Sequence, residues 1–380
     1  MVHRGRKVDS HRTLACLGGG EISTKAGLRN LWLKVHKWLG LIMAVPVILI
    51  FVSGSVLVWK DGVDALLHPA RQIDAAPSAD PSFYAAAATR YLAPDQSIVS
   101  LSYPSGRGPV LVIARTNGGW ERTRYFLHPK TGELVDRTPL SSGAMLLMHR
   151  VHASLLVPRI GGHIVGAISI LLLISVFSGA WLWWPTKGSW IRGLRWGRTQ
   201  STNANIHHLI GFWVAAPLVI LSITGTSLKY SSFFTAVLGD AAAVEAEAER
   251  DSAPPATNPR LTFRQALASS GFRAGYQLQS VAWPTTFDDR WRVTFANGSG
   301  NQVKGVADQT GRSGVVVAGP ETGIRLMQRI HVGMNMPVVW QLAMFLTGLL
   351  VPLLGVTGTI IWLRARSREK EMRLRRAPRA

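Results

Sequence analysis

The chain contains a long apolar stretch that occurs twice. Residues 36–59 read HKWLGLIMAVPVILIFVSGSVLVW, and residues 207–230 read HHLIGFWVAAPLVILSITGTSLKY. An α-helix needs about 20 apolar residues to cross the ~30 Å hydrocarbon core of a bilayer, so each stretch predicts a transmembrane helix. A shift of 171 residues aligns a histidine, two glycines and a proline of the two stretches. The fold is therefore predicted to be a helical membrane protein with an internal repeat.

Four segments of the 380-residue chain meet this length criterion, and we predict spans over 38–59, 163–184, 208–229 and 338–363. Charged residues make up only 17% of the chain, below the roughly 25% that is usual in soluble proteins. The net charge of +21 is concentrated at both termini and in residues 185–206. Because Lys and Arg accumulate on the cytoplasmic side, we expect cytoplasmic termini and two long connections outside, which is the periplasm if the cell is Gram-negative.

A second shift, of 179 residues, aligns the regions around the second and fourth spans. It pairs His152 with His331 and Arg150 with Arg329. Each half then contains a span, an external domain and a second span, which is a parallel repeat. The expected fold class is an α-helical membrane protein with four transmembrane helices in two parallel repeats and two α+β periplasmic domains.

This organisation divides the chain into nine segments. They are a basic cytoplasmic leader (1–30), the first span (31–59), periplasmic domain 1 (60–145), a histidine-bearing segment with the second span (146–184), a cytoplasmic loop (185–204), the third span (205–230), periplasmic domain 2 (231–325), a histidine-bearing segment with the fourth span (326–363) and a basic cytoplasmic tail (364–380).

The external segments have the composition of α+β domains. β-branched and aromatic runs that end at Gly-containing turns predict strands at 110–114, 123–127 and 291–295. The turns are expected at 117–119, 129–132 and Asn297-Gly298. Helices are predicted at 85–90 and 263–269, and residues 241–258, rich in Ala, Glu and Pro, are expected to form a mobile linker.

Four histidines stand at repeat-related positions beside the spans. His36 and His207 lie at the cytoplasmic edge, and His152 and His331 lie on the external side. Two imidazoles on opposite faces of a plane are the ligands of a six-coordinate haem, which needs no covalent attachment motif. We therefore predict two b-type haems, one held by each pair, with no separate catalytic side chain.

Other assignments of these residues remain open. Interfacial histidines also cap helices or reach lipid headgroups, and His149, one turn before His152, is an alternative external ligand. Arg150 and Arg329 are candidates for binding haem propionates or lipid phosphates.

Several other functions are excluded by the sequence. Cys16 is the only cysteine, so no thiolate metal site or disulfide framework is expected. Gly18-Gly19-Gly20 follows no predicted strand and is not a nucleotide site. The basic clusters contain no alternating aromatic residues, so the expected partner is membrane lipid and not nucleic acid.

The run Leu33–Leu41, which includes His36, resembles the opening of PepSY-associated transmembrane proteins. The turn at 129–132 and the run Asn205–His208 match later elements of that family. The resemblance covers residues 30–365 and is strongest to the inner-membrane ferrisiderophore reductases of the FoxB type. It implies that the two external domains are PepSY-like.

The resemblance also implies an activity. Di-haem members of this type reduce ferric ions of hydroxamate siderophores in the periplasm and release Fe(II). The chain lacks a flavin or nicotinamide motif, so the electron donor is expected to be a quinol or a separate reductase. The alternative implied by the family is a non-enzymatic membrane protein whose external domains bind a protease or peptide.

A bulky ferric siderophore needs a broad cleft with aromatic surface. Such a cleft is expected between the two external domains, near the external haem. Aromatic residues beside the repeat-related turns are candidates to line it, although each is also a candidate core residue; they are Tyr103, Trp120, Trp283 and Trp291.

Overall fold

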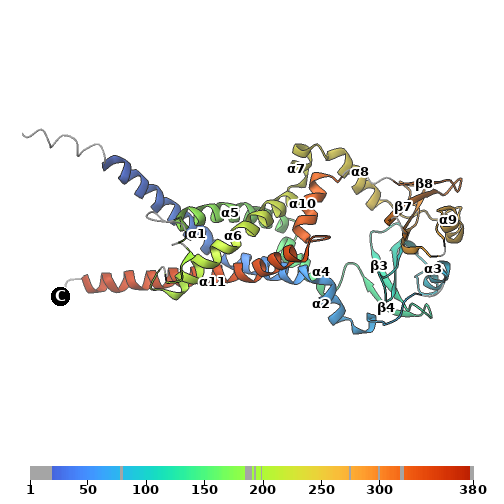
Figure 1. Ribbon diagram of the computed structural model, residues 1–380, viewed down its shortest axis with the longest axis horizontal. Helices are drawn as coiled ribbons and strands as arrows, with labels where there is room; N and C mark the ends of the chain where they lie inside the picture. Colours follow the sequence, from blue (N-terminus) through green and yellow to red (C-terminus); the bar gives the residue numbers. More distant parts are fainter. Residues whose placement is uncertain are drawn as a thin grey trace, which may run out of the picture. The chain divides into compact units, whose positions relative to one another are not determined.

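The computed structural model describes residues 19–77, 80–184, 191, 194–197, 199–273, 275–297, 300–316 and 321–376. Sequence features at Cys16, Gly18, Lys187, Arg192, Arg198 and Gly298 lie outside these residues. The chain divides into two compact units (Figure 1). A helical unit comprises Met1–Ser55, His152–Lys229 and Gly333–Ala380, and a sheet unit comprises Val56–Val151 and Tyr230–Val332.

Four helices are long and apolar enough to cross a membrane. They are α1 (Gly19–Val58), α5 (Gly161–Trp183), α6 (Thr202–Lys229) and α11 (Val338–Arg376). These helices cover the four predicted spans except for one residue at the end of the first and of the second, so the prediction of a four-span helical membrane protein is confirmed. Three of them include an internal proline (Pro46, Pro217 and Pro352), which a bundle tolerates because neighbouring groups satisfy the freed carbonyl.

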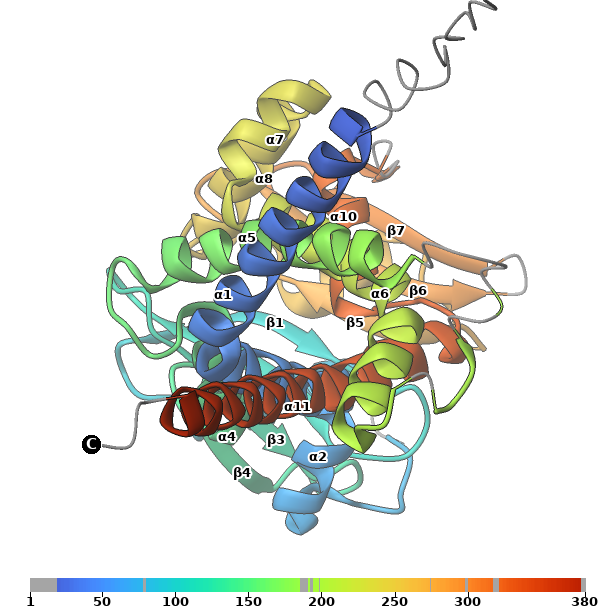
Figure 2. The same ribbon diagram turned by 90° about the vertical axis from the view of Figure 1, so that its left-hand side faces the viewer.

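The four helices pack side by side, and Figure 2 views them from the end at which α11 terminates. Small residues bring α1 close to α11, because a Cβ on Gly348 would collide with Oγ of Ser55. Trp183 of α5 stacks on Phe212 of α6, with ring centres 4.7 Å apart. The buried core is formed by apolar side chains of all four helices: Met43, Val47, Ile50, Val165, Ile168, Leu172, Val214, Leu218 and Val351.

The sheet unit contains one antiparallel sheet of eight strands, in the order β4-β3-β2-β1-β5-β6-β7-β8. The strands are β1 (Gln96–Ser102), β2 (Val110–Thr116), β3 (Arg122–Leu127), β4 (Leu134–Pro139), β5 (Gln277–Ala282), β6 (Arg290–Asn297), β7 (Gly300–Ala307) and β8 (Ser313–Val315). β1 pairs with β5 in the middle, through the register Ser100↔Ala282 to Ser102↔Ser280. The two expected domains are thus two halves of a single sheet.

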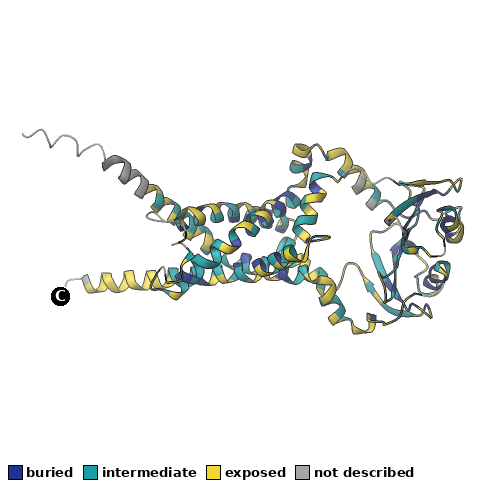
Figure 3. Ribbon diagram, in the orientation of Figure 1, coloured by how far each residue is buried: buried dark blue, intermediate teal, exposed yellow. Residues whose placement is uncertain are grey.

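Two short helices cover one face of this sheet, α3 (Pro81–Thr89) and α9 (Phe263–Ser269) (Figure 1). Each is capped at its N-terminus: Asp80 accepts a hydrogen bond from the Ser82 amide, and Thr262 forms a capping box with Gln265. The residues between the helices and the sheet form one continuous core (Figure 3).

The remaining elements connect spans and sheet. They are α2 (Lys60–Leu67), the 3-10 helix η1 (Pro69–Arg71), α4 (Ala144–Ser154), α7 (Ser231–Leu238), α8 (Ala241–Ser252) and α10 (Gly323–Val332). The predicted strands and the helix at 263–269 are confirmed, and the helix predicted at 85–90 begins earlier, at Pro81. The mobile linker predicted for 241–258 is wrong over Ala241–Ser252, because its Ala and Glu residues are strong helix formers.

Candidate cofactor site in the helical unit

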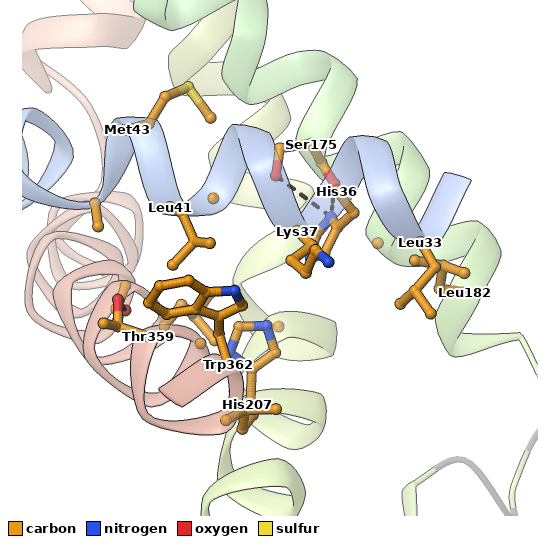
Figure 4. A pocket seen from close by; sticks show the side chains of 18 of the residues that line it. Leu33, His36, Lys37, Leu41, Met43, Ser175, Leu182, His207, Thr359 and Trp362 are labelled. Atoms are coloured by element: carbon orange, nitrogen blue, oxygen red, sulfur yellow. Dashed lines mark hydrogen bonds between the residues drawn. The ribbon is translucent and has the colours of Figure 1, made fainter. Parts of the chain in front are cut away.

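Two histidines from different helices face one cavity in the helical unit. His36 lies on α1 and His207 on α6, and their ring centres are 6.3 Å apart with ring planes at 83°. Both rings line a cavity of about 1130 Å³ (Figure 4). Small-molecule pockets typically measure about 300–1,000 Å³, so this cavity has room for a large prosthetic group.

The hydrogen bonds of His36 determine which ring nitrogen carries the proton. Its Nδ1 lies 3.0 Å from the carbonyl oxygen of Ser175 and 3.1 Å from Oγ of Ser178. A carbonyl oxygen only accepts, and the Ser178 hydroxyl donates its own proton to that same carbonyl at 2.9 Å. Both neighbours therefore require a donor at Nδ1, which leaves the lone pair on Nε2 for a metal.

His207 is held by an equivalent arrangement on α11. Its Nδ1 lies 3.1 Å from Oγ1 of Thr357. That hydroxyl donates its proton within its own helix, at 2.6 Å to the carbonyl oxygen of Leu353. Thr357 can then only accept from the ring, so His207 is also protonated at Nδ1 and presents Nε2 as a ligand.

Glycines provide the space in which the two rings lie. A Cβ on Gly179 would lie 3.0 Å from Cε1 of His36, and a Cβ on Gly358 would lie 3.3 Å from Cε1 of His207. Each glycine directly follows the hydroxyl residue that binds the same ring. The neighbouring helix therefore supplies each histidine with both a hydrogen-bond acceptor and a gap.

A bare metal ion would find too few ligands here. Within the described ranges, no group of three or more His, Cys, Asp or Glu side chains is arranged to hold an ion. A haem brings four nitrogen donors and needs only two axial ligands from the protein. His36 and His207, whose ring centres lie 6.3 Å apart on one cavity, are the two residues that would hold such a group here.

The lining of the cavity also suits a haem. Its walls include apolar side chains from all four helices, among them Met43, Leu172, Leu218 and Val351. Its rim carries the cations of Lys34, Lys37 and Arg366, with Glu369 as the acidic residue of the lining. An apolar interior with a cationic rim matches a flat macrocycle that carries acidic substituents.

A third histidine is held against α1 in the same manner. Nδ1 of His152 donates to the carbonyl oxygen of Ile50 at 2.7 Å, and a Cβ on Gly54 would lie 2.9 Å from its Cε1. Gly54 follows His36 by 18 residues, about 27 Å along a helix with a rise of 1.5 Å per residue. The helical unit therefore presents histidines of the same tautomer at two well-separated levels of α1.

The other predicted ligands and anion-binding residues lie in the sheet unit. His331 and Arg329 are in α10, where Arg329 forms an ion pair with Glu321 at 3.0 Å. His149 and Arg150 are exposed residues of α4, whereas His152 of the same helix is half-buried.

The aromatic residues predicted to line a substrate cleft belong mostly to the core. Trp291 is 1% exposed and donates from Nε1 to Asp308 at 2.9 Å. Trp283 and Tyr103 pack against the same core. Trp120, in contrast, is 73% exposed, with the guanidinium of Arg115 over its ring. Of the four residues, Trp291 is therefore a core residue, Tyr103 and Trp283 are half-buried beside it, and Trp120 is exposed.

The sequence analysis did not identify Ser175, Ser178 or Thr357. A signal for two of them was present, since the shift of 179 residues pairs Ser178 with Thr357, directly before the paired glycines. Ser175 approaches His36 Nδ1 with its main-chain carbonyl, at 3.0 Å, and with its hydroxyl, at 3.4 Å, and the carbonyl carries no sequence signal.

Four apolar helices around a paired-histidine cavity, together with an antiparallel sheet, define a polytopic helical membrane protein with a β-containing unit. The family model of the PepSY-associated TM region matches residues 33–365, and the chain belongs to this family. No curated protein shows significant similarity to the chain.

Proposed function

We propose that this protein is a di-haem transmembrane electron-transfer protein that reduces ferric siderophores of the hydroxamate type in the periplasm. One haem is held by His36 and His207, and the other by His152 and His331. The observation that carries the proposal is the pair His36 and His207, whose hydrogen bonds leave both Nε2 atoms available at one cavity.

The protein's own contribution is to hold and orient the ligands. Each bound haem supplies a one-electron Fe(III)/Fe(II) couple. Ser178 and Thr357 fix the tautomer and orientation of the two imidazoles, and they raise the basicity of the ligating nitrogen. The apolar wall excludes water, which tunes the potential of a buried iron centre.

Two levels of histidine support passage of electrons through the bilayer. His36 lies on α1, and His152 contacts α1 at Ile50 and Gly54, about 21–27 Å further along the helix, which is most of a ~30 Å hydrocarbon core. The sequence repeat pairs His152 with His331 as it pairs His36 with His207, and on this basis His331 is assigned as the second external ligand.

The direction of transfer follows from the charge distribution. The Lys/Arg excess at the termini favours cytoplasmic ends in a bacterial inner membrane, so electrons would enter from a quinol or a cytoplasmic reductase and leave outside. One electron converts one Fe(III) to Fe(II). Hydroxamate oxygens bind the larger Fe(II) far more weakly, so the reduction itself frees the metal from the siderophore.

The decisive test is the haem content of the purified protein. We expect two non-covalent haems per chain in a reduced-minus-oxidised spectrum, and one haem after His36→Ala or His207→Ala. Either substitution should remove the same haem, because both ligands serve one iron. A folded but colourless preparation from haem-replete cells would overturn the proposal and favour a membrane protein that binds a protease or peptide.

A further inference from the structure

Two connecting helices follow their spans without a linker. α2 begins one residue after α1 ends, and α7 begins one residue after α6 ends. The single residues between them are Trp59 and Tyr230, which the shift of 171 residues pairs. Their backbone angles are also alike, with φ −108° and ψ 29° at Trp59 and φ −110° and ψ 44° at Tyr230. Both corners thus break the helix in the same way.

The two corner residues indicate the depth at which the helices begin. Trp and Tyr at the ends of spans lie at the level of the lipid headgroups. Each following helix has eight residues, and so extends only about 12 Å from its corner. Every residue of α2 and α7 is therefore within reach of the membrane surface.

One face of α2 is held by polar contacts that extend to strand β4 of the same unit. Arg71, which is buried, binds Asp64 of α2 at 2.9 Å and Asp136 of β4 at 2.6 Å. The pKa of Asp136 remains below its usual value, because hydrogen bonds from Arg71 and Arg137 outweigh the opposing effect of burial. This cluster fixes the polar side of α2 toward the sheet.

The opposite face of α2 is apolar and exposed. Val63, Leu66 and Leu67 follow the i, i+3, i+4 spacing of one helix face. Leu66 is 79% exposed and Leu67 is 52% exposed, and none of the eight residues of α2 is buried. Figure 3 shows this exposure along the helix.

α7 also has an exposed apolar face, and it carries no charged side chain. Phe233 and Val237, at i and i+4, are 63% and 67% exposed, whereas Thr235 on another side is buried. The end of α7 is tied to α10, because Asp240 accepts a hydrogen bond from the Ile324 amide at 3.2 Å. The shift that pairs the two corners also pairs Leu66 with Val237.

We propose that α2 and α7 lie in the outer surface of the same bilayer that the spans cross, with these apolar faces inserted among the lipids. Both helices follow directly from a span, so the bilayer is the apolar phase next to their exposed faces. Short helices with exposed large apolar residues suit the interface between lipid and water. The proposal is independent of haem binding, because it rests only on the spans and their corners.

Site-directed spin labelling tests this proposal in the full-length protein. Cys16 is the only native cysteine, so a Cys16→Ser background accepts single labels at Leu66→Cys and Val237→Cys. Asp61→Cys on the polar face of α2 and Thr310→Cys in a sheet turn are matched exposed controls. The protein is reconstituted in phosphatidylcholine vesicles, and collisions with oxygen and with a water-soluble nickel chelate are compared.

We expect the ratio of oxygen to nickel collisions at Leu66 and Val237 to be several-fold higher than at both controls. Leu67→Cys and Phe233→Cys, on the same faces, should repeat the result if a first variant folds poorly. Nickel access equal to that at Thr310 would overturn the proposal. Shielding from both oxygen and nickel would also overturn it, because protein contact and not lipid would then cover these faces.

Discussion

Each of the facing histidines depends on one hydroxyl group from a neighbouring helix. The hydroxyls of Ser178 and Thr357 donate their protons to carbonyl groups of their own helices and use a lone pair to accept from Nδ1. A hydroxyl engaged in this way cannot rotate to donate to the ring. The tautomer of each imidazole is thus set by a hydrogen bond from a hydroxyl to a carbonyl group within the neighbouring helix.

Replacement of Thr357 by Val tests this role with little change of volume. Thr357→Val removes the hydroxyl that accepts from His207 Nδ1, and loss of such a partner typically weakens metal affinity about 10–100-fold. We expect lower haem retention when the protein is mixed with a haem-scavenging apoprotein. Thr347→Val is the control, because the Thr347 hydroxyl donates to the Ala343 carbonyl of the same helix at 2.7 Å and lies outside the cavity lining. Equal retention in both variants would contradict the role of Thr357.

At the scale of elements, local patterns were predictable and non-local pairing was not. Apolar length predicted the spans, and alternating residues predicted β2, β3 and β6. The β1–β5 contact joins strands 180 residues apart through a register of only three pairs, and no local pattern specifies it. The histidine pair was predictable because the repeat selected it, whereas the Ser175 carbonyl that accepts from His36 has no sequence signal.

Asp308 connects three elements of the sheet unit. Its buried carboxylate accepts hydrogen bonds from the amides of Arg260 and Leu261, at 2.6 and 3.0 Å, and from Trp291 Nε1. Burial acts to raise the pKa of Asp308, but these hydrogen bonds hold it below its usual value. The carboxylate thereby ties the segment before α9 to β6 and to the turn after β7.

Asp308→Asn should therefore destabilise the protein in a pH-dependent way. The amide cannot accept all three bonds, and one unsatisfied buried group costs about 1–3 kcal/mol. The folded-state pKa of Asp308 is depressed. The stabilisation that its ionised carboxylate provides is therefore present above the unfolded-state pKa of about 3.9 and is lost as pH falls through the folded-state pKa.

The measurement is the difference in thermal midpoint between wild type and Asp308→Asn, which should shrink below about pH 4. Asp74→Asn breaks an exposed ion pair with Arg107 and should change the midpoint little at any pH. A difference for Asp308→Asn that is constant from pH 7 to acid would argue against this account.

At the scale of the whole molecule, the charge distribution and the four spans predict a topology. We expect reporter fusions after residue 200 and at the C-terminus to read as cytoplasmic, and fusions near residues 100 and 280 to read as periplasmic. Both sheet halves must lie on one side, because β1 and β5 are hydrogen-bonded. A fusion at 100 and one at 280 that report opposite sides would be incompatible with this sheet.

The proposed activity is tested by electron transfer out of the protein. Ferrioxamine or ferrichrome is added anaerobically to dithionite-reduced protein after excess reductant has been removed. We expect haem reoxidation together with ferrous iron in a chelator assay, one Fe(II) per haem electron. The His207→Ala protein is the control, because it should lack the inner haem. That haem is expected to pass electrons toward the acceptor. Haems that stay reduced against every ferric siderophore would point to another acceptor.

The central β1–β5 pairing also constrains how the protein is made. Ser102 and Ser280 leave the ribosome 178 residues apart, which corresponds to roughly 10–40 s at about 5–20 residues per second. During that interval β1 is an open edge, and α5 and α6 have to be inserted before β5 can close it. An unpaired strand edge invites aggregation, so the first half of the sheet is exposed to that risk until the second half arrives.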